Sequence, residues 1–285
     1  MSKLKLAVQK SGKLQEGSIK LLKDCGIIIE NGIDKLKVNA KNFPLEVFYL
    51  RNNDIPQFLE DGVIDAAIIG ENTLIEKNKD SEIVVKLGFS KCKLVLAIPK
   101  NEIFNDLSWL EGKKIATSYP NSLKNFLEKN NINSDIHEIS GSVEIAPGIG
   151  MADAICDLVN SGSTLFKNGL KEVETILTSE ACLAKNINID CEVEKILSLL
   201  LFRIKSVLRA KRSKYILMNV PNDKIKQVSN ILPVLKSPTI LPLAIKGWSS
   251  LHSVINEDEF WMMIDQLKEA GAENILIIPI EKMVT

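Results

Sequence analysis

The sequence is poor in residues that hold metal ions. Its 285 residues include 5 cysteines and 2 histidines, and no two cysteines form a C-x-x-C pair. Zinc sites draw on clustered cysteine and histidine ligands, so no zinc site built by the protein is expected. The cysteines occur among apolar neighbours, as in KCKLVLAI and EACLA, and their number is odd. We expect reduced, mostly buried thiols, which are typical of a cytoplasmic protein.

The chain also lacks an excess of charge and any long apolar run. Lysine and arginine total 36, as do aspartate and glutamate, which gives a formal net charge of +0. A balanced chain has no overall field that attracts nucleic acid or an acidic membrane surface. Its longest apolar stretches have the length of a buried strand, and its start, MSKLKLAVQKSG, does not resemble a signal peptide. We therefore expect no nucleic-acid or membrane partner, and a cytoplasmic location.

What the chain does contain is a regular alternation of short apolar runs and amphipathic stretches. This strand–helix order predicts an α/β fold, with mostly parallel sheets that carry helices on both faces. The expected strands are 5–9, 45–50, 66–69, 93–98, 114–118, 135–139 and 154–159, and the expected helices are 16–25, 55–61 and 122–130.

A short internal repeat occurs in both halves of this strand–helix pattern. The segment GVIDAAII at 62–69 has the same form as GMADAICD at 150–157: a glycine that ends a helix, an aspartate three residues later and a buried strand. The repetition predicts two similar α/β lobes around a cleft. An expected strand at 180–184 returns the chain to the first lobe. We thus expect lobe I at 1–91 and 180–210, and lobe II at 92–179.

The last third of the chain has a different pattern. The run VEKILSLLLFRIKSVLRA predicts a long amphipathic helix. The elements after it follow the order βαββαβ, which is that of a ferredoxin-like module at 213–285. The residues alone indicate a structural or oligomerisation domain, because no chemically distinctive cluster stands in it.

The segment Asn160-Ser161-Gly162-Ser163-Thr164 gives the strongest functional signal. It follows a buried strand that carries Asp157, and a helical run begins directly after it. Hydroxyls, backbone N–H groups and the helix dipole of such a loop converge on an anion. A nearby carboxylate accepts hydrogen bonds from sugar hydroxyls. We predict that these residues bind a phosphorylated sugar; the loop taken alone is more typical of a turn or a helix cap.

Motifs along nearly the whole chain resemble one enzyme family. Between 144 and 170 the chain reads E-x-A-P-x-x-G-x-A-D-x-I-x-D-L-V-x-S-G-x-T-L-x-x-N-G-L. The other motifs are QKSGKL (9–14), R-x-x-D-I-P (51–56), DGVIDAAIIGEN (61–72), KIATSYPN (114–121), SKY (213–215), SPTILPL (237–243) and LIIPIEKM (276–283). Their order and separations resemble ATP phosphoribosyltransferase, the first enzyme of histidine biosynthesis.

The resemblance implies a fold, a reaction and its partners. The fold is a pair of periplasmic-binding-protein-like lobes with an ACT-like regulatory domain, as in the long form of the family. The reaction joins ATP to phosphoribosyl pyrophosphate, which gives N1-(5-phosphoribosyl)-ATP and pyrophosphate. The implied cofactor is Mg²⁺ bound through substrate phosphates, and the implied partners are the two substrates, histidine as inhibitor and further copies of the chain in a dimer or hexamer.

Within this reaction we assign the 5′-phosphate to Ser161, Gly162, Ser163 and Thr164, and the ribose hydroxyls to Asp157. The catalytic candidates are Asp157, Asp153, Arg51 and Lys10. The candidates for nucleotide or pyrophosphate binding are Lys10, Lys13, Arg51, Glu71, Ser118, Tyr119 and Glu144. The inhibitor candidates are Ser237, Thr239 and Leu241.

Several of these residues have structural alternatives. Asp153 is equally suited to cap the start of a strand, Glu144 to cap a short helix and Tyr119 to pack beside proline. Gly148 stands where the family often has arginine, so one phosphate contact is missing or comes from elsewhere. Two rival functions stay open from the residues: a two-lobed solute-binding or effector-binding protein without turnover, and a transferase with another base as acceptor.

Overall fold

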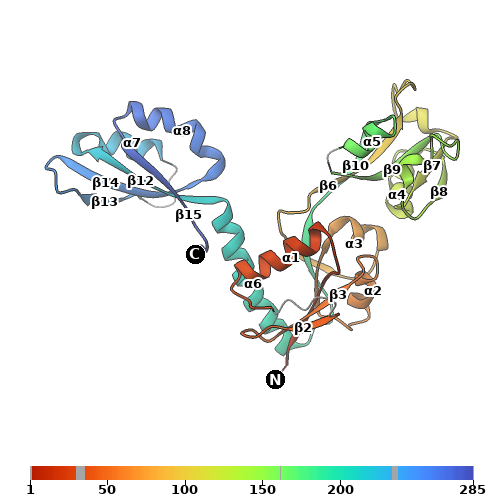
Figure 1. The fold of residues 1–285 in the computed structure, drawn as a ribbon, viewed down its shortest axis with the longest axis horizontal. Coiled ribbons are helices and arrows are strands. Elements are labelled where there is room, and N and C mark those ends of the chain that lie inside the picture. Colours follow the sequence, from red (N-terminus) through yellow and green to blue (C-terminus); the bar gives the residue numbers. More distant parts are fainter. Residues whose placement is uncertain (1, 30–35, 161, 233–236, 285) are drawn as a thin grey trace. The chain divides into compact units, whose positions relative to one another are not determined.

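The computed structural model describes residues 2–29, 36–160, 162–232 and 237–284, and its chain forms two compact units (Figure 1). The first unit comprises Met1–Lys23 and Ile27–Leu197, and the second comprises Asp24–Gly26 and Ser198–Thr285. Within the described ranges, no helix combines the length and the apolar character needed to cross a membrane.

Lobe I of the first unit is built on a six-stranded sheet in the order β2-β3-β1-β4-β11-β5. Strands β3, β1 and β4 run parallel, and β2, β11 and β5 pair antiparallel with their neighbours. The strands are β1 (Leu4–Gln9), β2 (Lys37–Asn39), β3 (Leu45–Leu50), β4 (Ala66–Gly70), β5 (Glu82–Lys86) and β11 (Ala181–Lys185). The central strand β4 reads AAIIG, an apolar run that suits burial on both faces of a sheet.

Three helices pack around this sheet (Figure 1). They are α1 (Lys13–Asp24), α2 (Ile55–Glu60) and α3 (Glu71–Lys77). Helix α1 buries Ser18, Leu21 and Leu22, which stand three and four residues apart and therefore share one face. Helix α2 has Pro56 in its first turn, where a missing N–H costs nothing.

Lobe II is built on a five-stranded sheet in the order β10-β6-β9-β7-β8. Its strands are β6 (Cys92–Pro99), β7 (Lys114–Thr117), β8 (Asp135–Glu138), β9 (Ala154–Val159) and β10 (Leu170–Ser179). Strands β9, β7 and β8 run parallel, β6 pairs antiparallel with β9, and the edge strand β10 pairs antiparallel with β6. The helices are α4 (Pro120–Lys129) and α5 (Ser163–Lys167), with short 3₁₀ turns at η1 (Leu107–Leu110) and η2 (Val143–Ile145).

The chain crosses between the lobes twice, at adjacent places. It leaves lobe I after β5 and returns to it between β10 and β11, where Ser179 pairs with Cys92 in the register of β10 and β6. Strand β11 then lies between β4 and β5. Lobe I is therefore discontinuous in sequence, with lobe II inserted into it.

The repeated G-x-x-D segments have a common structural role. Gly62 and Gly150 adopt left-handed φ angles of 68° and 74°, which glycine takes without strain. The Oδ2 atom of Asp65 accepts a hydrogen bond from the Lys5 backbone N–H at 2.7 Å. The Oδ2 atom of Asp153 accepts the corresponding bond from the Lys114 N–H at 2.9 Å. In each lobe the aspartate thus ties the start of one parallel strand to the start of its neighbour.

The second unit contains most of the long helix α6 (Cys191–Lys211) and the module that follows it. The module's sheet has the antiparallel order β13-β14-β12-β15, the ferredoxin-like arrangement of a βαββαβ chain. Its elements are β12 (Ser213–Pro221), η3 (Asn222–Lys224), α7 (Ile225–Ile231), β13 (Thr239–Pro242), β14 (Trp248–Asn256), α8 (Glu257–Glu269) and β15 (Glu273–Pro279). Its core joins Ile216, Met218, Val228, Leu251 and Leu267.

All five cysteines are free thiols, as the sequence predicts. Three of them, Cys25, Cys156 and Cys182, are buried, and Cys191 is exposed. Burial raises the pKa of Cys25 to about 11 and that of Cys182 to about 12. These two thiols therefore stay protonated and unreactive near neutral pH.

Candidate functional site

The predicted anion loop lines a cavity of about 330 Å³ at the carboxyl end of β9. Gly162 adopts a left-handed φ of 70° as the residue before α5, and the exposed Ser163 and Thr164 form the first turn of that helix. The first turn of a helix presents backbone N–H groups that have no partner within the helix. Ser161 lies outside the described residues. The cavity is lined by Glu144, Asp157, Leu158, Val159, Asn160, Gly162, Ser163, Thr164 and Leu165.

Asp157 supplies the carboxylate of this cavity. Its Oδ1 atom accepts a hydrogen bond from the Leu158 backbone N–H at 2.8 Å. Burial raises the pKa of the Asp157 carboxyl, the Leu158 bond lowers it, and the negative charge of Glu144 raises it again. Two carboxylates therefore share one cavity with the hydroxyls of the loop, a combination suited to a phosphorylated sugar with free hydroxyl groups.

Tyr119 interacts electrostatically with this carboxylate. It precedes α4 and packs against the apolar core of lobe II. Burial raises the pKa of its phenol, and the charge of Asp157 raises it further. The Tyr119 backbone N–H donates to Thr117 Oγ1 at 2.9 Å, which fixes the turn between β7 and α4.

Ser118 holds the loop that leads to Glu144. Its Oγ donates to the carbonyl oxygen of Ile139 at 2.6 Å and accepts from the Gly141 N–H at 3.3 Å. The structure thus gives Ser118 a positioning contact. Its role in nucleotide binding stays a prediction.

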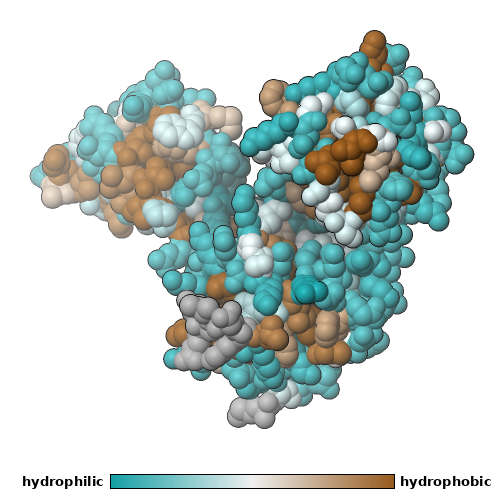
Figure 2. All heavy atoms as spheres, turned by 45° about the vertical axis from the view of Figure 1, so that its right-hand side comes forward, coloured by the Kyte–Doolittle hydropathy of each residue, from teal (hydrophilic) through white to brown (hydrophobic). Residues whose placement is uncertain are grey.

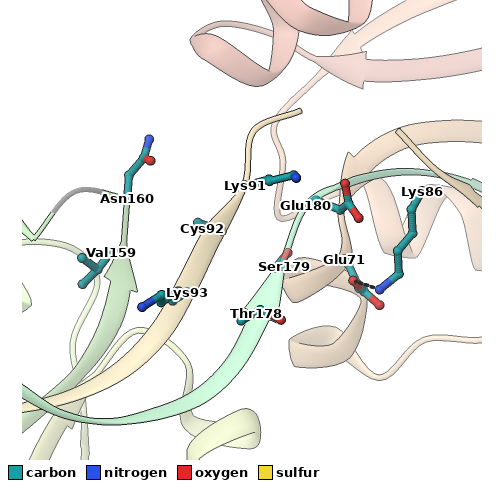
Figure 3. A pocket seen from close by; sticks show the side chains of 10 residues that line it. All are labelled: Glu71, Lys86, Lys91, Cys92, Lys93, Val159, Asn160, Thr178, Ser179 and Glu180. Atoms are coloured by element: carbon teal, nitrogen blue, oxygen red, sulfur yellow. Dashed lines mark ion pairs between the residues drawn. The ribbon is translucent and has the colours of Figure 1, made fainter. Parts of the chain in front are cut away.

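A second cavity of about 430 Å³ lies where the chain crosses between the lobes (Figure 3). It shares Val159 and Asn160 with the first cavity. Lys86 places its Nζ 2.9 Å from Glu71 Oε2, and Figure 3 shows this ion pair across the pocket from Lys93. The contact with the Glu71 carboxylate raises the pKa of the Lys86 ammonium. The lining residues are Glu71, Lys86, Lys91, Cys92, Lys93, Val159, Asn160, Thr178, Ser179 and Glu180.

Glu71 is among the site residues predicted from the sequence, whereas Lys86, Lys91 and Lys93 are not. These lysines stand on either side of the crossing in KLGFSKCK. The sequence could have indicated that these lysines converge on a cavity only if residues 86–93 had been recognised as the segment that connects the lobes. Because both cavities share lining residues, the anion loop lies next to a group of cationic side chains.

Lys10 and Arg51 are brought together at the carboxyl edge of the lobe I sheet. They follow the adjacent parallel strands β1 and β3, and the Lys10 N–H donates to the carbonyl oxygen of Leu50 at 2.8 Å. Both side chains are exposed, as is Lys13 at the first position of α1. These three cations do not line the two cavities. They form a separate basic group at the strand ends where α/β sheets receive ligands.

Asp153 lies away from these cavities. Four residues of extended chain separate it from Asp157 by about 13 Å. Its carboxylate is occupied by the Lys114 N–H and stands 3.9 Å from the Lys113 ammonium. The geometry favours the strand-start cap, and a catalytic role for Asp153 stays a prediction. Gly148 is exposed, and a Cβ there would meet only the Ile145 carbonyl at an ordinary 3.5 Å.

In the C-terminal module, two of the three inhibitor candidates lie on the edge strand β13. Thr239 stands opposite His252, and Leu241 opposite Ser250. The two ring nitrogens of His252 are hydrogen-bonded, Nδ1 with Tyr215 Oη at 2.8 Å and Nε2 with Ser250 Oγ at 2.9 Å. Ser237 is exposed just before the strand. Figure 2 shows hydrophobic atoms gathered on the visible side of this module.

The described side chains form no cluster of three or more His, Cys, Asp or Glu placed to hold a metal ion. Among the described residues that line the loop cavity, the acids are Glu144 and Asp157. Oxygen ligands of this kind suit Mg²⁺ when phosphates and water supply the other ligands.

The chain is similar to known proteins in sequence and in structure. Residues 51–206 match the family described as "HisG: ATP phosphoribosyltransferase", and residues 210–282 match "HisG, C-terminal domain". The chain is 56% identical over 281 residues to the ATP phosphoribosyltransferase of Cytophaga hutchinsonii, covering 99% of this chain and 98% of that protein. It is 53% identical to that of Phocaeicola vulgatus, covering 99% of each. A solved structure, the ATP phosphoribosyl transferase (HisG:HisZ) complex from Thermotoga maritima, has a chain with a TM-score of 0.61 and 30% identity, covering 71% of this chain and 98% of its own.

Proposed function

The chain belongs to the ATP phosphoribosyltransferase family, and on this premise we propose how its residues perform the family's reaction. The enzyme transfers the phosphoribosyl group of phosphoribosyl pyrophosphate to N1 of ATP and releases pyrophosphate, the first step of histidine biosynthesis. The observation that supports our placement of this reaction is the cavity that Asp157 and Glu144 share with Gly162, Ser163 and Thr164.

The loop before α5 binds the 5′-phosphate of the ribose. Its two hydroxyl side chains and the N–H groups of the first helical turn are hydrogen-bond donors, as a phosphate requires. Asp157 accepts hydrogen bonds from the ribose hydroxyls, and Glu144 lies beside it. Ser161 completes the loop in sequence and is assigned to the same phosphate.

The chemistry is a displacement at the anomeric carbon. The N1 lone pair of adenine forms the new bond to C1′, and the C1′–O bond breaks with its electrons going to pyrophosphate. The ribose acquires oxocarbenium character in the transition state, which the carboxylates of Asp157 and Glu144 stabilise. Adenine N1 carries no proton near neutral pH, so positioning and charge stabilisation suffice without a strong general base.

Two groups of cations serve the polyphosphates. Lys86, Lys91 and Lys93 surround the cavity that adjoins the loop, and we assign the leaving pyrophosphate to them. Lys10 and Arg51, with Lys13, offer a second group for the phosphates of ATP, and Arg51 suits phosphate because its planar guanidinium donates two parallel hydrogen bonds. Mg²⁺ bound to the substrate phosphates neutralises part of their charge.

The C-terminal module and the assembly of the chain serve regulation of this reaction. Histidine inhibits the enzyme at Ser237, Thr239 and Leu241 of the C-terminal module, and the chain works as a homo-oligomer in the cytoplasm. The free thiols support the cytoplasmic assignment, because such thiols persist in a reducing compartment. We place the boundaries between lobe I and lobe II at 91/92 and 179/180, and the start of the C-terminal module at 213. The rival function, a binding protein without turnover, is disfavoured by full-length relatives named as transferases.

One assay tests the proposal directly. The purified chain is incubated with ATP, phosphoribosyl pyrophosphate and Mg²⁺, and near-ultraviolet absorbance reports the adduct. We expect a steady increase that requires both substrates. Folded protein that gives no signal with ATP, and gains one with another base, would overturn the acceptor assignment.

A further inference from the structure

The side chain of Glu76, in the last turn of α3, joins the two lobes. Its residue is 5% exposed, and its carboxylate contacts the start of α4 in lobe II. Oε1 accepts from the Asn121 N–H at 3.0 Å, and Oε2 accepts from the Ser122 N–H at 2.9 Å and from Ser122 Oγ at 2.7 Å. The Glu76 carbonyl oxygen also accepts from Asn121 Nδ2 at 2.9 Å. All four hydrogen bonds cross from one lobe to the other.

This contact completes the N-terminus of α4. The residue before the helix, Tyr119, makes no side-chain cap, so the N–H groups of the first turn need acceptors from elsewhere. Glu76 provides both of its oxygens, and its negative charge is favourable at the positive end of the helix dipole. A buried carboxylate with three donors is a specific contact, because the same group would be unfavourable there without them.

The contact also lies beside the crossing between the lobes. Helix α3 begins at that crossing: the Glu71 N–H donates to the carbonyl oxygen of Glu180 at 3.0 Å, and Ser179 Oγ donates to Asn72 Oδ1 at 2.9 Å. Glu76 stands four residues after Asn72, about 6 Å along the helix axis. The two covalent crossings are adjacent and so allow rotation about them. The Glu76 contact is a third connection, about 6 Å along α3 from the crossings, and it restrains that rotation.

The two helices joined by Glu76 support groups from both parts of the site. At one end of α3, Glu71 pairs with Lys86, and Thr73 Oγ1 accepts from Asn52 Nδ2 at 2.7 Å, next to Arg51. On the other side, α4 follows strand β7, whose last residue Thr117 stands opposite Cys156, the neighbour of Asp157. We propose that Glu76 is a positioning residue that fixes the angle between the lobes and thereby sets the distance from the cations of lobe I to Asp157. This proposal rests on the function assigned above.

The test compares Glu76→Gln with a matched control. Glutamine keeps the shape of the side chain, but its amide group faces a backbone N–H, so at least one hydrogen bond becomes a donor–donor contact. We expect the KM for phosphoribosyl pyrophosphate to rise about tenfold, with kcat changed less than threefold, since a loss of preorganisation weakens binding before chemistry. Amide hydrogen exchange at 121 and 122 should become faster.

The matched control is Glu60→Gln. Glu60 also accepts hydrogen bonds through its carboxylate, from Lys79, Gln57 and Asp80, but all of these partners lie in lobe I. This variant should leave both KM values within twofold of the wild type. Ser122→Ala removes one of the three donors and should give a smaller increase in KM, about threefold.

Three results would overturn the proposal. The first is a folded Glu76→Gln enzyme with unchanged KM and unchanged exchange at 121 and 122. The second is the same rise in KM for Glu60→Gln. If Glu76→Gln does not fold, an unchanged KM in Ser122→Ala is the third. Failure of the assigned function is distinct, because the wild-type chain would then form no adduct while the exchange difference persisted.

Discussion

Glu144 and Asp157 line the same cavity, and the charge of Glu144 raises the pKa of the Asp157 carboxyl. The two residues come from different elements, the 3₁₀ turn η2 and strand β9. Ser118 holds the loop that carries the first of them. The ionisation of Asp157 is therefore coupled to Glu144, and the position of Glu144 depends on Ser118. This coupling can be measured.

Asp157→Asn should lower turnover about a hundredfold, because a neutral amide stabilises a developing positive charge poorly. Stability should be unchanged or slightly higher at neutral pH. Burial raises the folded-state pKa of Asp157, so this group's contribution to stability is fully present below the unfolded pKa and is lost as pH rises through the folded pKa. Steady-state kinetics and thermal unfolding at pH 7 check both effects. A parallel loss of turnover and stability would identify a structural acid.

Asp153→Asn is the matching variant in the same strand region and tests whether Asp153 is catalytic. Its carboxylate accepts from the Lys114 N–H and is otherwise exposed. We expect turnover within twofold of the wild type and a loss of about 1 kcal/mol in the free energy of unfolding, as for one hydrogen bond. Chemical denaturation with kinetics measures the two quantities. A large loss of turnover in a variant of unchanged stability would show that Asp153 is catalytic.

Glu144→Gln should move the acid limb of the pH profile to lower pH. Glu144 raises the pKa of Asp157, so removal of its charge lowers that pKa and keeps Asp157 ionised in more acidic solution. The measurement is kcat/KM across the acid range. Glu138→Gln, an exposed acid on β8, serves as the control and should leave the limb in place. A limb that moves equally in both variants would contradict the coupling.

Lys86→Met should raise the KM for phosphoribosyl pyrophosphate about tenfold, because one cation of the second cavity is lost. The dependence of KM on salt should also become weaker, since fewer charges attract the substrate. Kinetics at two ionic strengths measure both effects. Lys77→Met removes an exposed cation from α3 outside the cavities and should change neither. An equal effect of the two variants would indicate general charge attraction.

Leu241→Ala should weaken inhibition by histidine with little change in uninhibited turnover. Leu241 is 50% exposed on an edge strand, so its removal leaves the core of the module intact. Inhibition curves for the full chain give the comparison. Trp261→Ala on α8 removes another exposed apolar side chain and should leave inhibition unchanged. Unaltered inhibition in Leu241→Ala would place the effector elsewhere.

The strands with apolar, β-branched runs could be predicted from sequence because their own residues carry the signal. Strand β9 begins and ends at the expected residues, and β3 does as well. Helix α3 was missed because ENTLIEK is short and polar, and the partners that bury it come from distant segments. Strand β10 was missed because an edge strand tolerates charges such as those in LKEVETILTS.

The site residues also divide into those that a local sequence pattern predicts and those that only the fold brings together. The loop at 162–164 and Asp157 are close in sequence, so a local pattern was sufficient to join them. Lys86 and Lys93 belong to the site only because the chain crosses there between lobes. Glu76 is separated from Asn121 by 45 residues and had no local signal at all.

The position of β11 has a consequence for synthesis. Among the described strands, β5 pairs only with β11, and β11 also covers the open edge of β4. The ribosome must therefore have added residue 185 before the lobe I sheet can close. Lobe II is continuous from Cys92 to Ser179 and is complete earlier. Nascent chains should thus acquire an ordered insert while the flanking half still exposes unpaired strand edges, an interval in which aggregation competes with folding.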